Sequence, residues 1–224
     1  NTTNFNNLSS IGSGNLNYNW NFGDGGSSTN PQPSYTYSSS DTFQVILNVS
    51  SGAGCEDADT NSVIIYEQPE ALFAVNNNCF DDTTFFVDQS TGINLEYDWD
   101  FGDGTIDSVA NPFHIYDTSG TFTITLMVSN GNCSDMYQTN VTIYPRPVTR
   151  FISEDVCLDE SVQFTNTSML SSGTSNYQWF FGDSTSSTDI NPTHQYDTAG
   201  IYEVTLVQTS NLGCVDSFQE THII

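Results

Sequence analysis

Apolar and polar residues alternate with a period of two along several stretches of the chain. The clearest lie at residues 43–49, 122–128 and 202–206, where every second residue is aromatic or aliphatic. Successive side chains of a β-strand point to opposite faces, so this pattern predicts strands with one buried face. Turn-forming residues interrupt the chain at short intervals, and no stretch keeps a helical period. The pattern therefore predicts an all-β protein built from short strands.

A second alternating stretch, centred on a tryptophan, occurs three times. The copies read YNWNFGDG, YDWDFGDG and YQWFFGDS, with their tryptophans 79 and 80 residues apart. Self-similarity at a fixed period marks an internal repeat. Because aromatic residues alternate around each tryptophan, all three are expected to point into a core: Trp20, Trp99 and Trp179.

Further landmarks keep the same offsets in each copy. A tyrosine follows each tryptophan by 17 residues, and a cysteine with an aspartate two positions beyond it comes later in each copy. The chain is therefore interpreted as three modules of a normal small-domain size, at residues 1–66, 67–145 and 146–224. The repeat offsets also place the beginning of the first module upstream of residue 1. Proline in both linkers predicts modules that stand end to end as a semi-rigid rod.

The motif Y-x-W-x-F-G-D-G, a later P-x-H-x-Y and an aromatic-led alternating strand together resemble the PKD domain. The resemblance covers essentially the whole chain, and it implies three tandem immunoglobulin-like β-sandwiches of the kind found in extracellular stalks. The closing G-x-C-x-D of the second module (Gly131 to Asp135) and the G-C-x-D of the third (Gly213 to Asp216) are similar to PKD repeats in large surface proteins of the Bacteroidetes phylum. The first module departs from the pattern at Tyr35, where the others have His114 and His194. The third has Ser184 in place of a turn glycine.

The five cysteines fall at repeated positions, and two complete modules carry one early and one late cysteine each. The expected disulfides are Cys79–Cys133 and Cys157–Cys214, with the partner of Cys55 upstream of residue 1. In an oxidising compartment each bond would contribute about 4 kcal/mol. The alternatives are five buried free thiols in a cytosolic protein and a zinc site, but the chain has no C-x-x-C spacing.

The chain is strongly acidic, with 27 Asp and Glu residues against two basic residues and a net charge of −25. Nucleic acid binding requires a basic surface that displaces counterions, so nucleic acid is excluded as a partner. Anionic membrane surfaces are disfavoured for the same reason, and no membrane insertion is expected in this segment. The acidic surface should attract divalent cations, although a solvated exterior suited to saline surroundings explains it as well.

The Gly-Asp-Gly turn raises the question of a metal site. Its spacing does not fit an EF-hand loop, and only one aspartate recurs in all three copies. These aspartates are therefore expected to hydrogen-bond their own turns: Asp24, Asp103 and Asp183. If calcium binds, acidic residues near the linkers are the candidate ligands: Glu67, Glu70, Glu154 and Asp155. No other cofactor is expected.

No sequence signature of catalysis appears: the chain lacks G-x-S-x-G, H-E-x-x-H and P-loop patterns, so no enzymatic activity is expected. The first functional hypothesis is a non-catalytic stalk, fibre or adhesin segment on a bacterial cell surface, which contacts its neighbouring modules, other protein subunits or surface glycans. Resemblance points to adhesins exported by type IX secretion. The second is a spacer in a secreted polysaccharide or protein hydrolase. The third is direct carbohydrate binding through exposed aromatics such as Phe113 and Phe180.

Overall fold

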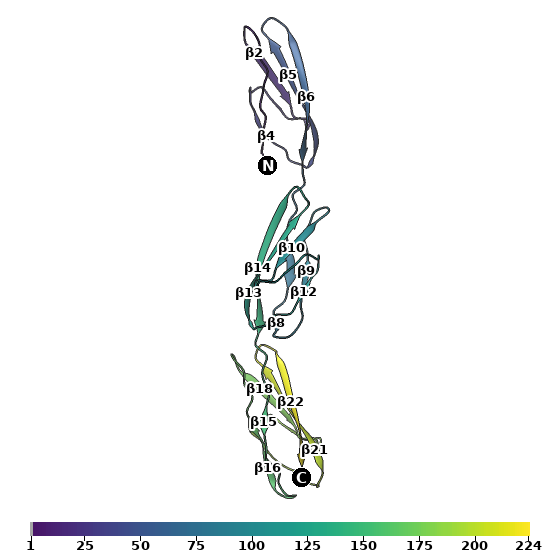
Figure 1. The fold of residues 1–224 in the computed structure, drawn as a ribbon, viewed down its shortest axis with the longest axis vertical. Helices are drawn as coiled ribbons and strands as arrows, with labels where there is room; N and C mark the ends of the chain where they lie inside the picture. The colour runs from purple at the N-terminus through teal and green to yellow at the C-terminus, as the bar shows by residue number, and fades with distance from the viewer. Residues whose placement is uncertain (1) are drawn as a thin grey trace. The chain divides into compact units, whose positions relative to one another are not determined.

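In a computed structural model, which describes residues 2–224, every regular element is a β-strand (Figure 1). No helix among these residues is long and apolar enough to cross a membrane. The chain divides into two compact units. One consists of Asn1–Glu70, Thr91–Leu95 and Ser129–Asp135, and the other of Ala71–Ser90, Glu96–Val128 and Met136–Ile224.

The first module contains a four-stranded sheet in the order β3-β2-β5-β6 and a two-stranded sheet, β1-β4. Its long hairpin, β5–β6, carries the first of the alternating stretches, and the tryptophan strand β2 pairs antiparallel with β5. The strands are β1 (Thr2–Asn4), β2 (Leu16–Asn21), β3 (Ser27–Ser28), β4 (Ser34–Thr36), β5 (Asp41–Ser51) and β6 (Glu56–Ile65).

The second module has a five-stranded sheet, β11-β10-β13-β14-β8, and a three-stranded sheet, β12-β9-β7. The short strand β8 runs parallel to the end of β14, which places Cys79 opposite Tyr144. The strands are β7 (Phe73–Val75), β8 (Asn78–Cys79), β9 (Thr84–Asp88), β10 (Glu96–Asp100), β11 (Ile106–Asp107), β12 (Phe113–His114), β13 (Gly120–Ser129) and β14 (Ser134–Tyr144).

The third module repeats the four-stranded sheet as β19-β18-β21-β22, and two strand pairs, β15-β17 and β16-β20, complete it. The strands are β15 (Phe151–Ile152), β16 (Ser161–Gln163), β17 (Thr165–Asn166), β18 (Ser175–Phe180), β19 (Ser186–Ser187), β20 (Thr193–Gln195), β21 (Ile201–Ser210) and β22 (Val215–Ile223).

Each module has its own hydrophobic core, built around its tryptophan. Trp99 and Trp179 are fully buried, and Trp20 is 6% exposed. Each indole Nε1–H donates to a backbone carbonyl ten residues later, at 2.9–3.0 Å. The apolar face of each alternating strand packs on this ring, so the three modules have three separate cores rich in aromatic residues.

A second buried hydrogen bond also recurs in every module. The hydroxyl of the tyrosine 17 residues after each tryptophan donates to the carbonyl of the phenylalanine that precedes the turn glycine, at 3.0–3.2 Å. A buried hydroxyl needs such a partner, and the accepting carbonyl belongs to a phenylalanine whose side chain is buried in the same core. The tyrosines are Tyr37, Tyr116 and Tyr196. The all-β architecture expected from the alternation is confirmed.

Candidate functional site

The recurring aspartate lies in the turn that follows the tryptophan strand, and its carboxylate is occupied by neighbouring groups. In the second module, Oδ1 of Asp103 accepts from the backbone N–H of Thr105 at 3.0 Å and from its hydroxyl at 2.6 Å. Oδ2 lies 2.6 Å from Nε2 of His114. Both carboxylate oxygens are therefore engaged within the module.

We call this group of turn aspartate, turn threonine and aromatic ring the corner. The other two modules have the same corner with small variations. Asp183 contacts Thr185 and His194 in the same way, with 2.7 Å between Oδ2 and the imidazole Nε2. In the first module the hydroxyl of Tyr35 takes the place of the imidazole and donates to Asp24 at 2.9 Å. Each of these rings stacks on the phenylalanine before the turn glycine, at 4.0–4.6 Å between ring centres. The corner thus requires a flat ring with a polar edge, which both residue types supply.

Electrostatics follow from this geometry. Partial burial would raise the pKa of Asp103, but hydrogen bonds from Thr105 and His114 favour the ionised carboxylate and bring its pKa below the ordinary value. The pKa of Asp183 is lowered by the same balance, with Thr185 and His194 as the donors. Burial also raises the pKa of the Tyr116 phenol far above its usual value. The corner therefore holds a carboxylate and a neutral phenol at neutral pH.

Within residues 2–224, neither the corner nor the linkers bring together enough ligating side chains for a metal site. Among residues 2–224, no group of three or more His, Cys, Asp or Glu side chains is arranged to hold a metal ion. Of the calcium candidates, Asp155 lies 3.5 Å from Nδ1 of His222 with a mostly exposed side chain. The backbone of Glu70 pairs with Thr91 as an isolated bridge. Calcium binding at Glu67, Glu70, Glu154 and Asp155 remains an untested prediction.

The first module contains a hollow of about 710 Å³ beside Trp20, lined among others by Leu47, Asp57 and Asp59. In the second module Phe73 packs on Trp99 at 4.9 Å between ring centres, and Tyr137 packs on Phe73 at 5.3 Å. Within residues 2–66 no strand corresponds to β7, which carries Phe73. The hollow is therefore an incompletely covered core, and its lining contains no histidine or cysteine.

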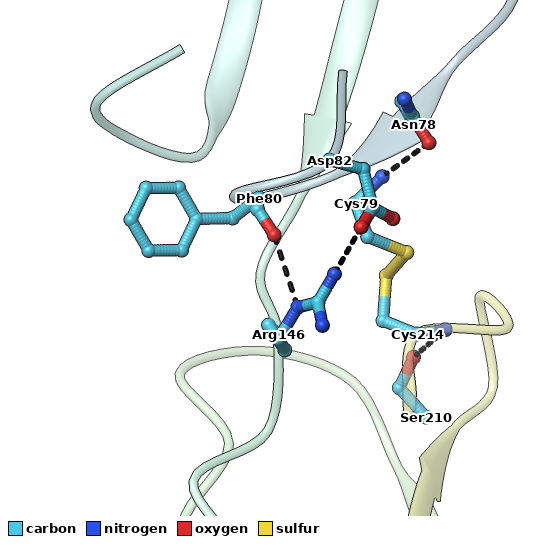
Figure 2. Close-up of a disulfide and its surroundings, with 7 residues drawn as sticks. All are labelled: Asn78, Cys79, Phe80, Asp82, Arg146, Ser210 and Cys214. Atoms are coloured by element: carbon cyan, nitrogen blue, oxygen red, sulfur yellow. Dashed lines mark hydrogen bonds and ion pairs between the residues drawn. A yellow bond between two sulfur atoms is a disulfide. The ribbon is translucent and has the colours of Figure 1, made fainter. Parts of the chain in front are cut away.

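The disulfide of this structure joins two modules. Cys79 of the second module is bonded to Cys214 of the third, with 5.7 Å between the Cα atoms and 135 residues between them in sequence (Figure 2). Cys55, Cys133 and Cys157 are free thiols. The predicted pairs Cys79–Cys133 and Cys157–Cys214 are therefore wrong, although Cys79 and Cys214 do form a disulfide.

Strand length explains why a pair within one module cannot form. Cys79 lies opposite Tyr144 at one end of β14, and Cys133 immediately precedes the other end of that strand. At about 3.3 Å per residue, the eleven residues from Cys133 to Tyr144 span about 36 Å. A disulfide tolerates at most about 7 Å between Cα atoms. In the third module, Asp155 lies two residues before Cys157 and 3.5 Å from His222. His222 is eight residues along β22 from Cys214, which corresponds to about 26 Å. Cys157 and Cys214 therefore also lie near opposite ends of a strand.

The linker between these two modules is fixed beside the disulfide. Nε of Arg146 donates to the carbonyl of Phe80 at 3.0 Å, and its guanidinium forms an ion pair with Asp82 (Figure 2). On the side of the third module, the N–H of the buried Thr149 donates to Oδ2 of Asp216 at 2.7 Å. Sequence reasoning had assigned no role to Arg146. The signal was present, because the two basic residues of the chain both lie in this linker.

Two exposed phenylalanines form a small aromatic patch on the second module. Phe85 of β9 and Phe113 of β12 are directly paired across the sheet, about two-thirds exposed, with 6.5 Å between ring centres. The corresponding cross-strand pair in the third module is Gln163 with Thr193. The patch therefore belongs to one module rather than to the repeat. Phe180 in the third module is half exposed.

Comparison with known proteins gives relatives for single modules. Collagenase ColA of Bacillus cereus is 41% identical over 56 residues, which is 25% of this chain and 6% of that protein. The PKD1 domain of the Vibrio cholerae metalloprotease PrtV is 40% identical, covering 35% of this chain and 96% of that domain, with a TM-score of 0.33. The chain therefore matches only a small part of the length of the curated relative.

Another comparison extends over most of the chain. The structure of titin domains I67–I69 is 14% identical, covers 96% of this chain and 89% of that one, and has a TM-score of 0.51. At this identity the likeness concerns the fold, a series of immunoglobulin-like β-sandwiches. The model of the PKD domain matches residues 1–65, 67–143 and 144–224. The chain belongs to the PKD domain family and consists of three tandem copies of that domain.

Proposed function

We propose that these tandem PKD domains form a non-catalytic structural segment of an extracellular protein, a stalk or fibre that projects or assembles an adhesive surface. The observation that carries the proposal is the Cys79–Cys214 disulfide, which fastens one module to the next. A flexible tether needs no such bond, whereas a segment that transmits force or holds an orientation gains from it. Disulfides form in oxidising compartments, which supports an extracellular location.

The absence of catalysis is part of the proposal. Catalysis needs a base or nucleophile beside a pocket with substrate access. The Asp103–His114 and Asp183–His194 pairs are the best acid–base candidates of the chain, but each carboxylate is held by its own turn threonine. Each imidazole stacks face to face on a core phenylalanine. These contacts account for the pairs as parts of the scaffold.

Single-molecule stretching between the two termini tests the mechanical role. Because force applied outside residues 79–214 passes through the disulfide, the 135 residues within that loop cannot extend. We therefore expect the Cys79→Ser/Cys214→Ser variant to release about 470 Å more contour length on full unfolding than the wild-type chain. Cys157→Ser, which removes a free and exposed thiol, is the matched control and should behave like wild type. We call this disulfide-linked contact between two modules the joint. Equal contour lengths in the variant and the wild type would refute its role in bearing force.

The second candidate is a spacer in a secreted hydrolase, and the match to a stretch of collagenase ColA favours it. A spacer of this kind either binds the insoluble substrate or leaves binding to other domains. Cosedimentation of the chain with insoluble collagen and with cellulose, compared with Phe85→Ala/Phe113→Ala, tests for a substrate-binding patch. Retention that is lost in the double variant would favour the hydrolase accessory role, with glycan or protein binding through this aromatic pair. A chain that stays in solution supports the structural segment.

A further inference from the structure

The cysteines of this chain are of two kinds, defined by position in the module. The turn cysteines, Cys79 and Cys157, are each the first residue of a turn that leads into the next strand, β9 or β16. The hairpin cysteines close the tip of the long hairpin: Cys55, Cys133 and Cys214. The observed disulfide joins the turn cysteine of one module to the hairpin cysteine of the module that follows it.

Cys157 begins the same kind of backbone turn as the bonded Cys79, although Cys79 is also a residue of strand β8. The carbonyl of Cys79 accepts from the N–H three residues later at 3.0 Å, and the carbonyl of Cys157 does so at 3.1 Å. Each turn contains an aspartate in the left-handed region, Asp81 with φ 68° and Asp159 with φ 72°. Cys157 is exposed and has no sulfur partner.

Cys55 corresponds in the same way to the bonded Cys214. The N–H of Cys55 donates to the hydroxyl of Ser51 at 3.1 Å, and that of Cys214 to the hydroxyl of Ser210 at 3.0 Å. The preceding glycines have φ values of 84° and 86°. One difference separates the two sites: Cys214, covered in its joint, is 1% exposed, whereas Cys55 is exposed. The exposed hairpin therefore has the backbone of a joint without the partner that covers it.

We propose that Cys55 and Cys157 are open halves of the same inter-module joint. Cys157 forms a disulfide with the hairpin cysteine of a further PKD domain, and Cys55 forms one with the turn cysteine of a further PKD domain. The Cys79–Cys214 bond is the independent observation, because it shows the same two positions bonded between adjacent modules. A single copy of this chain carries both halves, so a second copy provides the partner that the test requires. The proposal holds for a stalk and for a hydrolase spacer alike.

The bond requires an oxidant, which we take to be a small-molecule disulfide such as oxidised glutathione. A thiolate first displaces one glutathione thiol and forms a mixed disulfide on Cys55. The thiolate of Cys157 then attacks the protein sulfur of that mixed disulfide and releases the second glutathione thiol. Two protein thiols are oxidised to one disulfide, one glutathione disulfide is reduced to two thiols, and the two thiol protons pass to the released glutathione.

The test uses two variants of the three-module chain, each with one reactive thiol. Cys55→Ser/Cys133→Ser retains Cys157, and Cys133→Ser/Cys157→Ser retains Cys55. Both retain Cys79 and Cys214, and peptide mapping confirms that bond before mixing. The proteins are incubated alone and together in a glutathione redox buffer, and covalent dimers are measured by non-reducing electrophoresis and mass spectrometry.

We expect the mixed dimer, linked through Cys157 and Cys55, to exceed either homodimer on the order of tenfold, because docking raises the local thiol concentration. Unselective oxidation would give only about twice as much mixed dimer as each homodimer, and that result would overturn the proposal. Failure to form any dimer, or absence of the Cys79–Cys214 bond, would also overturn it. The wild-type chain provides a measurement that does not depend on the variants: its oxidised oligomers should yield a cross-linked peptide containing Cys55 and Cys157.

Discussion

The turn glycine after each tryptophan strand lies where no other residue fits. Gly102 has φ of +78°, and a Cβ built on it would be 2.5 Å from the carbonyl oxygen of Thr123 on the neighbouring strand. The equivalent glycines of the other modules have the same sign of φ and the same clash with a neighbouring strand. The motif therefore keeps this glycine because the turn must pass against the backbone of the next strand.

Gly102→Ala is expected to lower the free energy of unfolding of the second module by about 3 kcal/mol, since strain in the left-handed region adds to the clash. Gly104→Ala is the matched control, because its φ is +93° but its Cβ would meet open space. That variant should lose about 1 kcal/mol. Urea unfolding of both variants measures the difference, and equal losses would contradict a role for close approach.

The turn aspartates make stability depend on pH at the acidic end. The pKa of Asp103 in the folded state is lowered, so the stabilisation from its hydrogen bonds is complete above the unfolded pKa of about 3.9. It is lost as pH falls through the folded pKa. Wild type and Asp103→Asn should therefore differ in unfolding free energy at pH 7, and the difference should be smaller at pH 2. Urea unfolding at the two pH values measures this difference, and a pH-independent difference would contradict the linkage.

At the scale of the element, alternation predicted two strands of each module, the tryptophan strand and the first strand of the long hairpin, and the face that each of them buries. The tryptophan strand and the first strand of the long hairpin in each module carry buried or half-buried aromatic or aliphatic residues at alternate positions. The second hairpin strand of the first module, β6, has no buried residue. The substitution of Ser184 for a turn glycine also fits, because Ser184 keeps a positive φ of 75°. The local pattern was informative here because residues i and i+2 of a strand point to the same face of the sheet, so a buried face appears as apolar residues at alternate positions.

Cysteine pairing could not be predicted from the same repeats. Each complete module supplies one turn cysteine and one hairpin cysteine, so the repeat places cysteines at the same positions whether they pair within a module or with the next module. Only the length of the hairpin distinguishes the two pairings, because it places the two cysteines of one module at opposite ends of a strand. Repetition therefore identified the cysteines but not their partners.

The joint is expected to stabilise the third module against unfolding. When that module unfolds beside a native second module, Cys79 stays paired with Tyr144, and the bond to Cys214 closes a loop from Tyr144 to Cys214. Closing about 70 residues contributes about 4 kcal/mol in the chain-entropy account. Cys79→Ser/Cys214→Ser should therefore lower the midpoint temperature of one thermal unfolding transition, that of the third module, which calorimetry measures. Cys157→Ser should leave all transitions in place, and an unchanged double variant would contradict the stabilisation.

At the scale of the whole molecule, charge is the dominant feature. The 27 carboxylates face two arginines, and the four ion pairs of residues 2–224 include only one arginine, Arg146 with Asp82. Most carboxylates therefore repel one another across the surface, which opposes the compact state. Pairing cannot relieve this repulsion, so the ions of the medium must do so.

Raising sodium chloride from 10 to 150 mM shortens the screening length from about 30 to about 8 Å. We therefore expect the melting temperature of the chain to rise with salt, whereas a surface stabilised by ion pairs would lose stability. Magnesium and calcium chloride at equal ionic strength separate screening from binding. A larger rise with calcium than with magnesium, lost in Glu67→Gln/Glu70→Gln or in Glu154→Gln/Asp155→Asn, would establish the calcium site predicted near a linker. Equal effects of the two cations would leave screening as the whole explanation and end the calcium hypothesis.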